Sequence, residues 1–202
     1  MTRFLLIRHG ATDAIGHVLS GRTPGIHLNA EGRKQAQGLA KILEEGYALP
    51  AILSSPLERA IETAQPIADA QGLTLSVDES FIEFDFGEWT GLAFSELDSR
   101  PEWREYNRYR SLHCAPEGES LADVQRRAWK RIQALCRAFG DQTVAIVSHA
   151  DVIRAVLLLA LGMPLDNILR LAIPLASITE LQVGEGAPVV RSIGIAGRDE
   201  SA

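Results

Sequence analysis

The sequence predicts an α/β fold, a three-layer sandwich in which helices flank a mostly parallel central sheet and a lid region is inserted. Three observations carry this prediction. Short aliphatic and β-branched runs alternate with segments of helical periodicity, as in βαβ crossover units. The chain has 202 residues, enough for one domain with a sizeable core. Hydrophobic residues make up 46% of it and charged residues 23%, an ordinary globular composition that argues against a disordered or fibrous chain.

The first third of the chain predicts two strands and the helices that follow them. The apolar run at residues 3–7 suits a buried strand, and apolar positions at helical spacing follow over residues 29–45. We expect Gly46 to end this helix in the left-handed conformation. Residues 51–54 predict the second strand. Ser55 is the expected cap of the next helix, because proline follows it and glutamate stands three residues later.

The second half predicts a long helix, a further helix and three more strands. The long helix begins at Ser120, has one apolar face, and ends at Gly140. The predicted strands are residues 143–147, about 177–183 and about 189–195. The first of them runs through Ser148 and His149 into an apolar helix that extends to about Leu161.

The composition changes in the middle of the chain. Eight of the 12 aromatic residues fall between Phe81 and Tyr109, mixed with glycines and charges. We interpret residues 1–202 as a single domain with a lid-like insertion at about 81–118. A second small core beneath a long connection explains the same composition, and the sequence leaves both interpretations open.

The charge and the apolar runs argue against several classes of partner. The formal net charge is -6 and no block of lysine and arginine occurs, so we expect no nucleic acid and no anionic membrane as partner. The longest apolar run, residues 155–165, falls well short of the roughly 20 residues that span a bilayer. The apolar stretch at 4–7 is too short for the core of a signal peptide.

The two cysteines and the absence of export signals favour a cytoplasmic protein. Cys114 and Cys136 lack the spacing of a redox or zinc motif, and both are expected to be packing residues in a reducing compartment. Nothing in the composition decides between a monomer and a homo-oligomer.

Polar side chains follow three of the predicted strands. Arg8 and His9 end the first strand, Ser54 and Ser55 end the second with Arg59 one helical turn further, and Ser148 and His149 end the third. Because the carboxyl ends of neighbouring parallel strands meet at one edge of a sheet, two histidines and two arginines are expected to converge there. This convergence predicts a ligand site.

The other histidines and one arginine series have weaker claims. His17, His27 and His113 stand in loop-like stretches and are expected at the surface. Arginines recur every four residues at Arg100, Arg104 and Arg108, which on a helix would form one basic face. That face could read an acidic group of a substrate, although pairing with Glu96, Glu102 or Glu105 is the more ordinary use.

Four segments together match a known pattern. They are residues 6–12 (LIRHGAT), 54–60 (SSPLERA), 83–91 (EFDFGEWTG) and 147–150 (VSHA). In this order they resemble the signatures of the histidine phosphatase superfamily, also called phosphoglycerate mutase-like proteins. The length resembles the small phosphatase branch, which includes α-ribazole phosphatase, more than the mutases.

The resemblance implies roles for individual residues. It implies that His9 is the nucleophile and becomes phosphorylated, and that Glu83 is the general acid. Arg8, Arg59 and His149 would surround the phosphoryl group. The other residues expected to bind substrate are Thr12, Ser20, Gly21, Arg22 and Ser148. Spacing alone leaves Asp85 and Glu88 open as alternatives to Glu83.

Elementary chemistry agrees with these roles. An imidazole attacks phosphorus only when the attacking nitrogen is unprotonated, and nearby arginines lower the histidine pKa. We expect the carbonyl of Gly10 to hold the other ring N–H of His9. Apolar neighbours at Phe81, Ile82 and Phe84 would raise the pKa of Glu83 if they bury it.

The sequence therefore predicts a metal-independent phosphomonoesterase that acts on a small phosphorylated metabolite. No spacing typical of metal ligands occurs, and no cofactor is expected. Two alternatives stay open, a cofactor-dependent phosphoglycerate mutase and a non-catalytic module that binds a phosphorylated ligand. Ala11 stands where the family often has glutamate, and Ile15 where an asparagine often contacts phosphate, which puts the substrate type and the tightness of phosphate binding in doubt.

Overall fold

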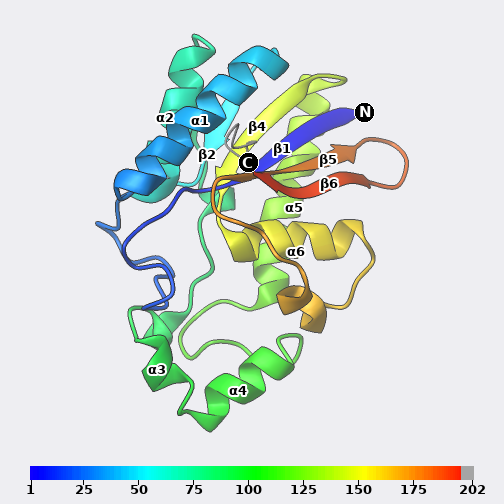
Figure 1. The fold of residues 1–202 in the computed structure, drawn as a ribbon. Coiled ribbons are helices and arrows are strands. Elements are labelled where there is room, and N and C mark those ends of the chain that lie inside the picture. The colour runs from blue at the N-terminus through cyan, green and yellow to red at the C-terminus, as the bar shows by residue number, and fades with distance from the viewer. Residues whose placement is uncertain (197–202) are drawn as a thin grey trace.

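A six-stranded sheet organises the molecule. The structure is a computed structural model that describes residues 1–196, and its strands lie in the order β3-β2-β4-β1-β5-β6. β1 is parallel to β4, and β2 is parallel to both β4 and β3. β5 and β6 run antiparallel at the other edge. The predicted fold class, an α/β sandwich with a mostly parallel sheet, is confirmed (Figure 1).

The chain alternates between strands and helices for most of its length. The strands are β1 (Thr2–Arg8), β2 (Ile52–Ser54), β3 (Ser76–Val77), β4 (Thr143–Ser148), β5 (Ser177–Val183) and β6 (Val189–Ala196). The α-helices are α1 (Ala30–Gly46), α2 (Glu58–Ala70), α3 (Phe94–Leu97), α4 (Pro101–Arg108), α5 (Leu121–Phe139) and α6 (Ala150–Ala160). Short 3₁₀ helices are η1 (Glu79–Phe81), η2 (Gly87–Trp89) and η3 (Leu165–Arg170). No helix among residues 1–196 is long and apolar enough to cross a bilayer.

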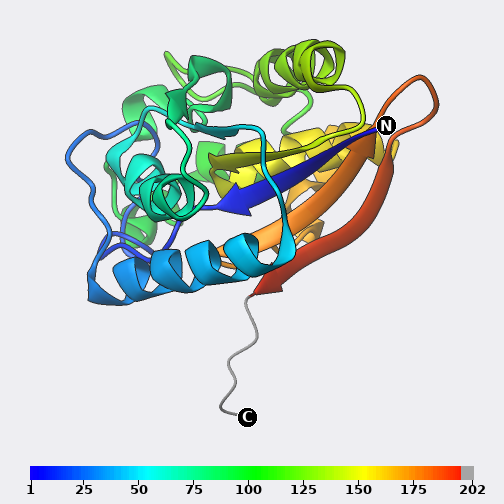
Figure 2. The same cartoon turned by 90° about the horizontal axis from the view of Figure 1, so that it is seen from above.

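The two faces of the sheet pack against different helix pairs. Successive side chains of a strand point to opposite faces, and the central strands β1 and β4 are apolar on both. Phe4 and Leu6 of β1 join the apolar cluster of α5 and α6, whereas Leu5 and Ile7 join that of α1 and α2. Figure 2 shows the sheet between these layers.

The structure confirms both predicted ends of α5 and corrects the predicted end of α1 and the predicted start of α2. Ser120 caps α5 in a capping box with Asp123, and Gly140 ends it with φ of 55°, as predicted. Gly46 is the last residue of α1 and not a left-handed cap, so that prediction was wrong. Ser55 was also wrong as a helix cap, because α2 begins at Glu58 after Leu57 and has no side-chain cap. The Ser55 side chain is committed to another contact, described below.

Residues 81–118, which we call the cap segment, lie at one end of the sheet and carry α3 and α4 (Figure 1). Their aromatic rings pack on one another, with Trp89 and Trp103 edge to face at 5.4 Å and Phe84 and Phe86 stacked at 4.6 Å. These rings belong to the same apolar cluster as the α5 and α6 face of the sheet. The cap segment therefore shares the main core and has no separate one.

The cysteines differ from the expectation. Cys136 is half-buried and packs against the core, but Cys114 is exposed, so the prediction of two packing residues was wrong for Cys114. Cys114 lies in the loop after α4, where the sequence has no periodic apolar pattern that would indicate a buried position.

A close contact between the turn after β1 and the first turn of α1 depends on Gly32. A Cβ at Gly32 would lie 2.1 Å from the carbonyl oxygen of Ala11, so no side chain fits. We expect Gly32→Ala to destabilise the protein by about 2 kcal/mol, lowering Tm by several degrees, because it overpacks a backbone contact. Gly38→Ala in the same helix is the matched control. Nothing lies within 4 Å of that position, so the variant should raise Tm slightly. Equal Tm values for the two variants in a thermal melt would contradict this packing argument.

Candidate active site

The three predicted strand ends meet at one edge of the sheet. Arg8 is the register partner of Ser148, and Ser54 is the partner of Val147. The backbone N–H of His9 donates to the carbonyl of Ser148 at 3.0 Å, which joins the turns after β1 and β4. The convergence inferred from the sequence is therefore confirmed.

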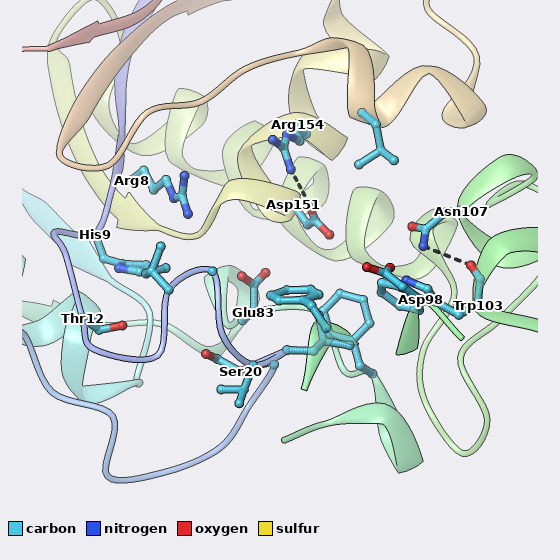
Figure 3. Close-up of a pocket in the computed structure, with 18 of the residues that line it drawn as sticks. Arg8, His9, Thr12, Ser20, Glu83, Asp98, Trp103, Asn107, Asp151 and Arg154 are labelled. Atoms are coloured by element: carbon cyan, nitrogen blue, oxygen red, sulfur yellow. Dashed lines mark hydrogen bonds and ion pairs between the residues drawn. The ribbon is translucent and has the colours of Figure 1, made fainter. Parts of the chain in front are cut away.

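A cavity of about 690 Å³ opens at this edge between the sheet and the cap segment. Among the residues predicted for the site, those that line it are Arg8, His9, Thr12, Ser20, Gly21, Arg59 and Glu83. Ile15 lines it as well. Figure 3 shows His9 and Arg8 at one end of the cavity and Asp98 and Asn107 at the other.

His9 is held as a neutral imidazole with one defined free nitrogen. Its side chain is buried, and Nδ1 lies 2.8 Å from the carbonyl oxygen of Gly10, the contact predicted from the sequence. Since a carbonyl only accepts, Nδ1 carries the proton and Nε2 keeps its lone pair. Burial, together with the charges of Arg59 and Arg8, lowers the pKa of His9 to about 3 against the opposing effect of the Gly10 hydrogen bond. Burial, not the arginines, is thus the largest cause.

Two arginines beside His9 are fixed by backbone carbonyls. Arg8 donates from Nη1 to the carbonyl of Ile173 at 2.7 Å, and Arg59 donates from Nη2 to the carbonyl of Gly21 at 2.8 Å. Nε of Arg8 and Nη1 of Arg59 are buried and have no hydrogen-bond partner among the described residues. Unsatisfied buried donors cost stability, so their concentration here indicates a site shaped for an anion.

His149 lies against His9 and is oriented by a serine that we had assigned to a helix cap. The two imidazole centroids are 5.2 Å apart, and Nε2 of His149 is 2.7 Å from Oγ of Ser55. Nδ1 has no hydrogen-bond partner among residues 1–196 and is 3.8 Å from Oε2 of Glu83. Burial and then the nearby His9 and Arg59 hold the pKa of His149 well below its usual value.

Glu83 is the only one of the three candidate acids that lines the cavity. Its carboxylate accepts from the N–H of Phe84 at 2.9 Å. Burial raises the pKa of Glu83 to about 7, with the negative charge of Asp151 adding to the effect. Asp85 instead accepts from the N–H of Gly87 and pairs with an arginine, and Glu88 is exposed.

Three residues expected to bind substrate do not line the cavity: Arg22, Ser148 and His149, of which His149 lies behind His9 and contacts Ser55. Arg22 does not line the cavity. Its guanidinium donates to the carbonyl of Glu83 at 2.9 Å and to Glu119 at 2.8 Å, so it holds the segment that carries Glu83. Ser148 donates to the carbonyl of Phe81 at 2.8 Å and is also absent from the lining. Arg22 and Ser148 lie off the cavity for the same reason, because their side chains donate to backbone carbonyls of the neighbouring segment.

Sequence reasoning missed a buried charge cluster on the cavity wall. Asp151 lies between Arg110 of the cap segment, at 3.0 Å, and Arg154, at 2.9 Å. The Asp151–Arg154 pair could have been predicted, because these residues are three apart in α6, the helix that starts right after His149. Arg110, 41 residues from Asp151, gave no such signal.

The remaining histidines and most of the arginine series considered in the sequence lie at the surface. His17 and His27 are exposed and His113 is half-buried, and none lines the cavity. Arg100 pairs with Glu96, as the more ordinary interpretation expected. Arg104 lines the cavity and donates to the backbone carbonyl of Asp98 at 2.8 Å. No group of three or more His, Cys, Asp or Glu side chains within residues 1–196 is arranged to hold a metal ion.

Comparison with known proteins shows the family to which the chain belongs. A family profile described as the histidine phosphatase superfamily (branch 1) matches residues 4–196. The chain belongs to the histidine phosphatase superfamily. The match covers nearly the whole chain, including the four segments that suggested the resemblance.

Individual members of the superfamily are similar over most of this chain. A bifunctional protein of Mycobacterium tuberculosis is 36% identical over 200 residues, which are 97% of this chain and 54% of that protein. The chain thus spans about half the length of that relative. Phosphoserine phosphatase 1 of Hydrogenobacter thermophilus is 30% identical over 201 residues, 96% of this chain and 93% of that one. The structure of a mycobacterial glucosyl-3-phosphoglycerate phosphatase superposes with a TM-score of 0.86 at 28% identity, covering 95% of this chain and 98% of that one.

Proposed function

We propose that this protein is a metal-independent phosphomonoesterase that hydrolyses small organic phosphate esters through a phosphohistidine at His9. The superfamily relatives include proteins named as phosphoserine, glucosyl-3-phosphoglycerate and acid phosphatases, which supports this class of reaction. The observation that carries the proposal is the pairing of a neutral His9 with a Glu83 that keeps its proton until about pH 7. A nucleophile and an acid are thereby both in their working forms over the same pH range.

The first half-reaction transfers the phosphoryl group to His9. The lone pair on Nε2 forms the P–N bond while the bond from phosphorus to the ester oxygen breaks. Glu83 gives its proton to the departing alkoxide, which leaves as the alcohol. The unpartnered donors of Arg8 and Arg59 supply positive charge to the non-bridging oxygens, where charge gathers in the transition state.

The second half-reaction regenerates the enzyme. Glu83, now a carboxylate, takes a proton from a water molecule that attacks phosphorus. The P–N bond breaks, phosphate leaves, and the electron pair returns to Nε2 of His9. The hydrogen bond from Nδ1 to the carbonyl of Gly10 keeps the ring in one tautomer throughout.

His149 and Thr12 are the further donors that we assign to the phosphoryl group. The Ser55 hydroxyl accepts from the N–H of Leu57 at 3.4 Å and so has its own proton free to donate to Nε2 of His149. In that tautomer Nδ1 carries the one N–H proton of the His149 ring and can donate it. Oγ1 of Thr12 is buried without a partner among the described residues and lines the cavity.

The location and partners of the protein follow the same proposal. We place it in the cytoplasm, where phosphorylated metabolites are found and where its two free cysteines stay reduced. Its partner is a small phosphorylated metabolite, and the net charge of -6 favours neither nucleic acid nor an anionic membrane.

The proposed function is tested by release of inorganic phosphate from p-nitrophenyl phosphate and a panel of phosphorylated metabolites, in the presence of a chelator. We expect hydrolysis that the chelator does not change, since no step uses a metal. Absence of phosphate release from every ester would overturn the proposal. Isomerisation of phosphoglycerate faster than its hydrolysis would make the protein a mutase instead.

A further inference from the structure

The cavity holds more positive charge than a phosphate ester needs. Five arginines line it, Arg8, Arg59, Arg104, Arg110 and Arg154. The carboxyl groups that line it are Glu83, Asp98 and Asp151. With Glu83 protonated, the excess is three positive charges, and a phosphate monoester dianion balances two of them. The chain as a whole has a net charge of -6, so this local excess is a property of the cavity.

The unbalanced charge lies on the wall beside the phosphoryl end. Asp151 is shared by Arg110 and Arg154, which leaves this cluster with one net positive charge. Burial alone would raise the pKa of Asp151, but the two arginines outweigh it and hold the pKa below its ordinary value, so Asp151 is ionised. Asp98 lies at the far end, where its backbone carbonyl accepts from Arg104 at 2.8 Å, and the opposite charges of these two residues balance each other.

Arg154 is the member of the cluster that can receive a ligand. Nε donates to the carbonyl of Leu171 at 2.8 Å and Nη1 to Asp151 at 2.9 Å, which fixes the plane of the guanidinium. Nη2 has no hydrogen-bond partner among the described residues. Arg110, in contrast, is 4% exposed and uses both terminal nitrogens on Asp151 and Asn107. Figure 3 shows Arg154 on the same side of the cavity as Arg8, between the His9 end and the Asp98 end.

We propose that Arg154 binds a carboxylate of the substrate, so that the preferred substrates are short phosphorylated hydroxy or amino acids. A carboxylate is planar and accepts hydrogen bonds from a fixed guanidinium, and it supplies the third negative charge. Arg154 and Arg8 line the same cavity on the same side, so one short molecule can place its phosphate ester at Arg8 and its carboxylate at Arg154. This inference rests on the proposed phosphatase function.

Two pairs of substrates test the inference on the unmodified protein. O-phosphoserine and O-phosphoethanolamine differ only in the carboxylate, and 3-phosphoglycerate differs from glycerol 3-phosphate by a carboxylate in place of a hydroxymethyl group. We expect kcat/KM to be at least about 10-fold higher for the carboxylate member of each pair, the effect of one charge-assisted hydrogen bond. Equal turnover within the pairs would overturn the subsite and leave the phosphatase function standing. No turnover of any of the four, nor of p-nitrophenyl phosphate, would instead refute the phosphatase function.

Variants then locate the carboxylate. Arg154→Gln should reduce the preference for the carboxylate member by about 10- to 100-fold, mainly through KM. Arg126→Gln is the matched control and should keep the preference, since Arg126 is exposed on α5 and, among residues 1–196, pairs with Asp123 alone. Arg154→Lys keeps a charge beside Asp151 and should give an intermediate preference. This variant tests the assignment even if Arg154→Gln does not fold. An equal loss for both members of a pair, or a preference abolished by Arg104→Gln and not by Arg154→Gln, would contradict the assignment.

Discussion

His9→Ala is expected to abolish phosphate release, with a fall in kcat of at least about 10⁴-fold, because it removes the nitrogen to which we assign the covalent intermediate. The fold should survive, since the side chain makes a single hydrogen bond, to the carbonyl of the next residue. The arginines remain in place, so inorganic phosphate should still raise the Tm of the variant. The measurement is steady-state hydrolysis of p-nitrophenyl phosphate together with a thermal melt in phosphate.

His17→Ala is the control for this prediction. His17 is exposed and does not line the cavity, so its removal should leave kcat unchanged. Residual hydrolysis by purified His9→Ala within tenfold of the unmodified protein would mean that water, activated elsewhere, attacks the ester directly.

Glu83→Gln is expected to lower kcat by about 10²- to 10⁴-fold, the contribution of a general acid and base. In the unmodified protein kcat/KM should fall as the pH rises through about 7, because Glu83 then loses the proton that the leaving alkoxide needs. The glutamine variant has no such proton, so its residual activity should not show that fall. The pH profile of kcat/KM with an alkyl phosphate ester, whose alkoxide must be protonated as it leaves, measures both effects.

The same substitution should stabilise the protein at alkaline pH. The pKa of Glu83 is raised in the folded state, so its contribution to stability is present below about pH 4.5 and is lost as the pH rises through about 7. Glutamine does not ionise and avoids that loss. We expect Glu83→Gln to gain on the order of 2 kcal/mol in the free energy of unfolding at pH 8, and little at pH 4.

Glu88→Gln is the matched control for both effects. Glu88 was an alternative acid by spacing alone, but it is exposed and lies off the cavity. Activity and stability should be unchanged in this variant. If Glu88→Gln lost the activity and Glu83→Gln kept it, the acid would be wrongly assigned.

The parts of the site that were predictable are those encoded locally. Arg8 and His9 directly follow an apolar run, so the sequence itself marks a strand with polar side chains at its carboxyl end. Neighbouring parallel strands bring such ends together. The contact of His9 with the carbonyl of Gly10 joins adjacent residues, so it also followed from the sequence. The low pKa of His9 was predicted in direction, although burial contributes more than the arginines that suggested it.

The parts that were missed depend on contacts between distant segments. Arg110 reaches Asp151 from the cap segment, and Arg22 reaches the carbonyl of Glu83 from the loop after β1. Nothing near these residues in sequence indicates their partners. Ser55 had the local signature of a helix cap, but its hydroxyl contacts His149 instead, and a tertiary contact outweighed a local preference.

The central claim is that a phosphorylated imidazole forms at position 9, and trapping that species tests it most directly. The protein is mixed with a labelled phosphate ester, quenched in alkali within one turnover, digested, and its peptides are analysed by mass spectrometry. The account predicts a phosphoryl group on His9 that is stable in alkali and lost in acid, and that is absent from His9→Ala. Hydrolysis of the ester with no covalent phosphate on the protein, or with the phosphate on another residue, would contradict it.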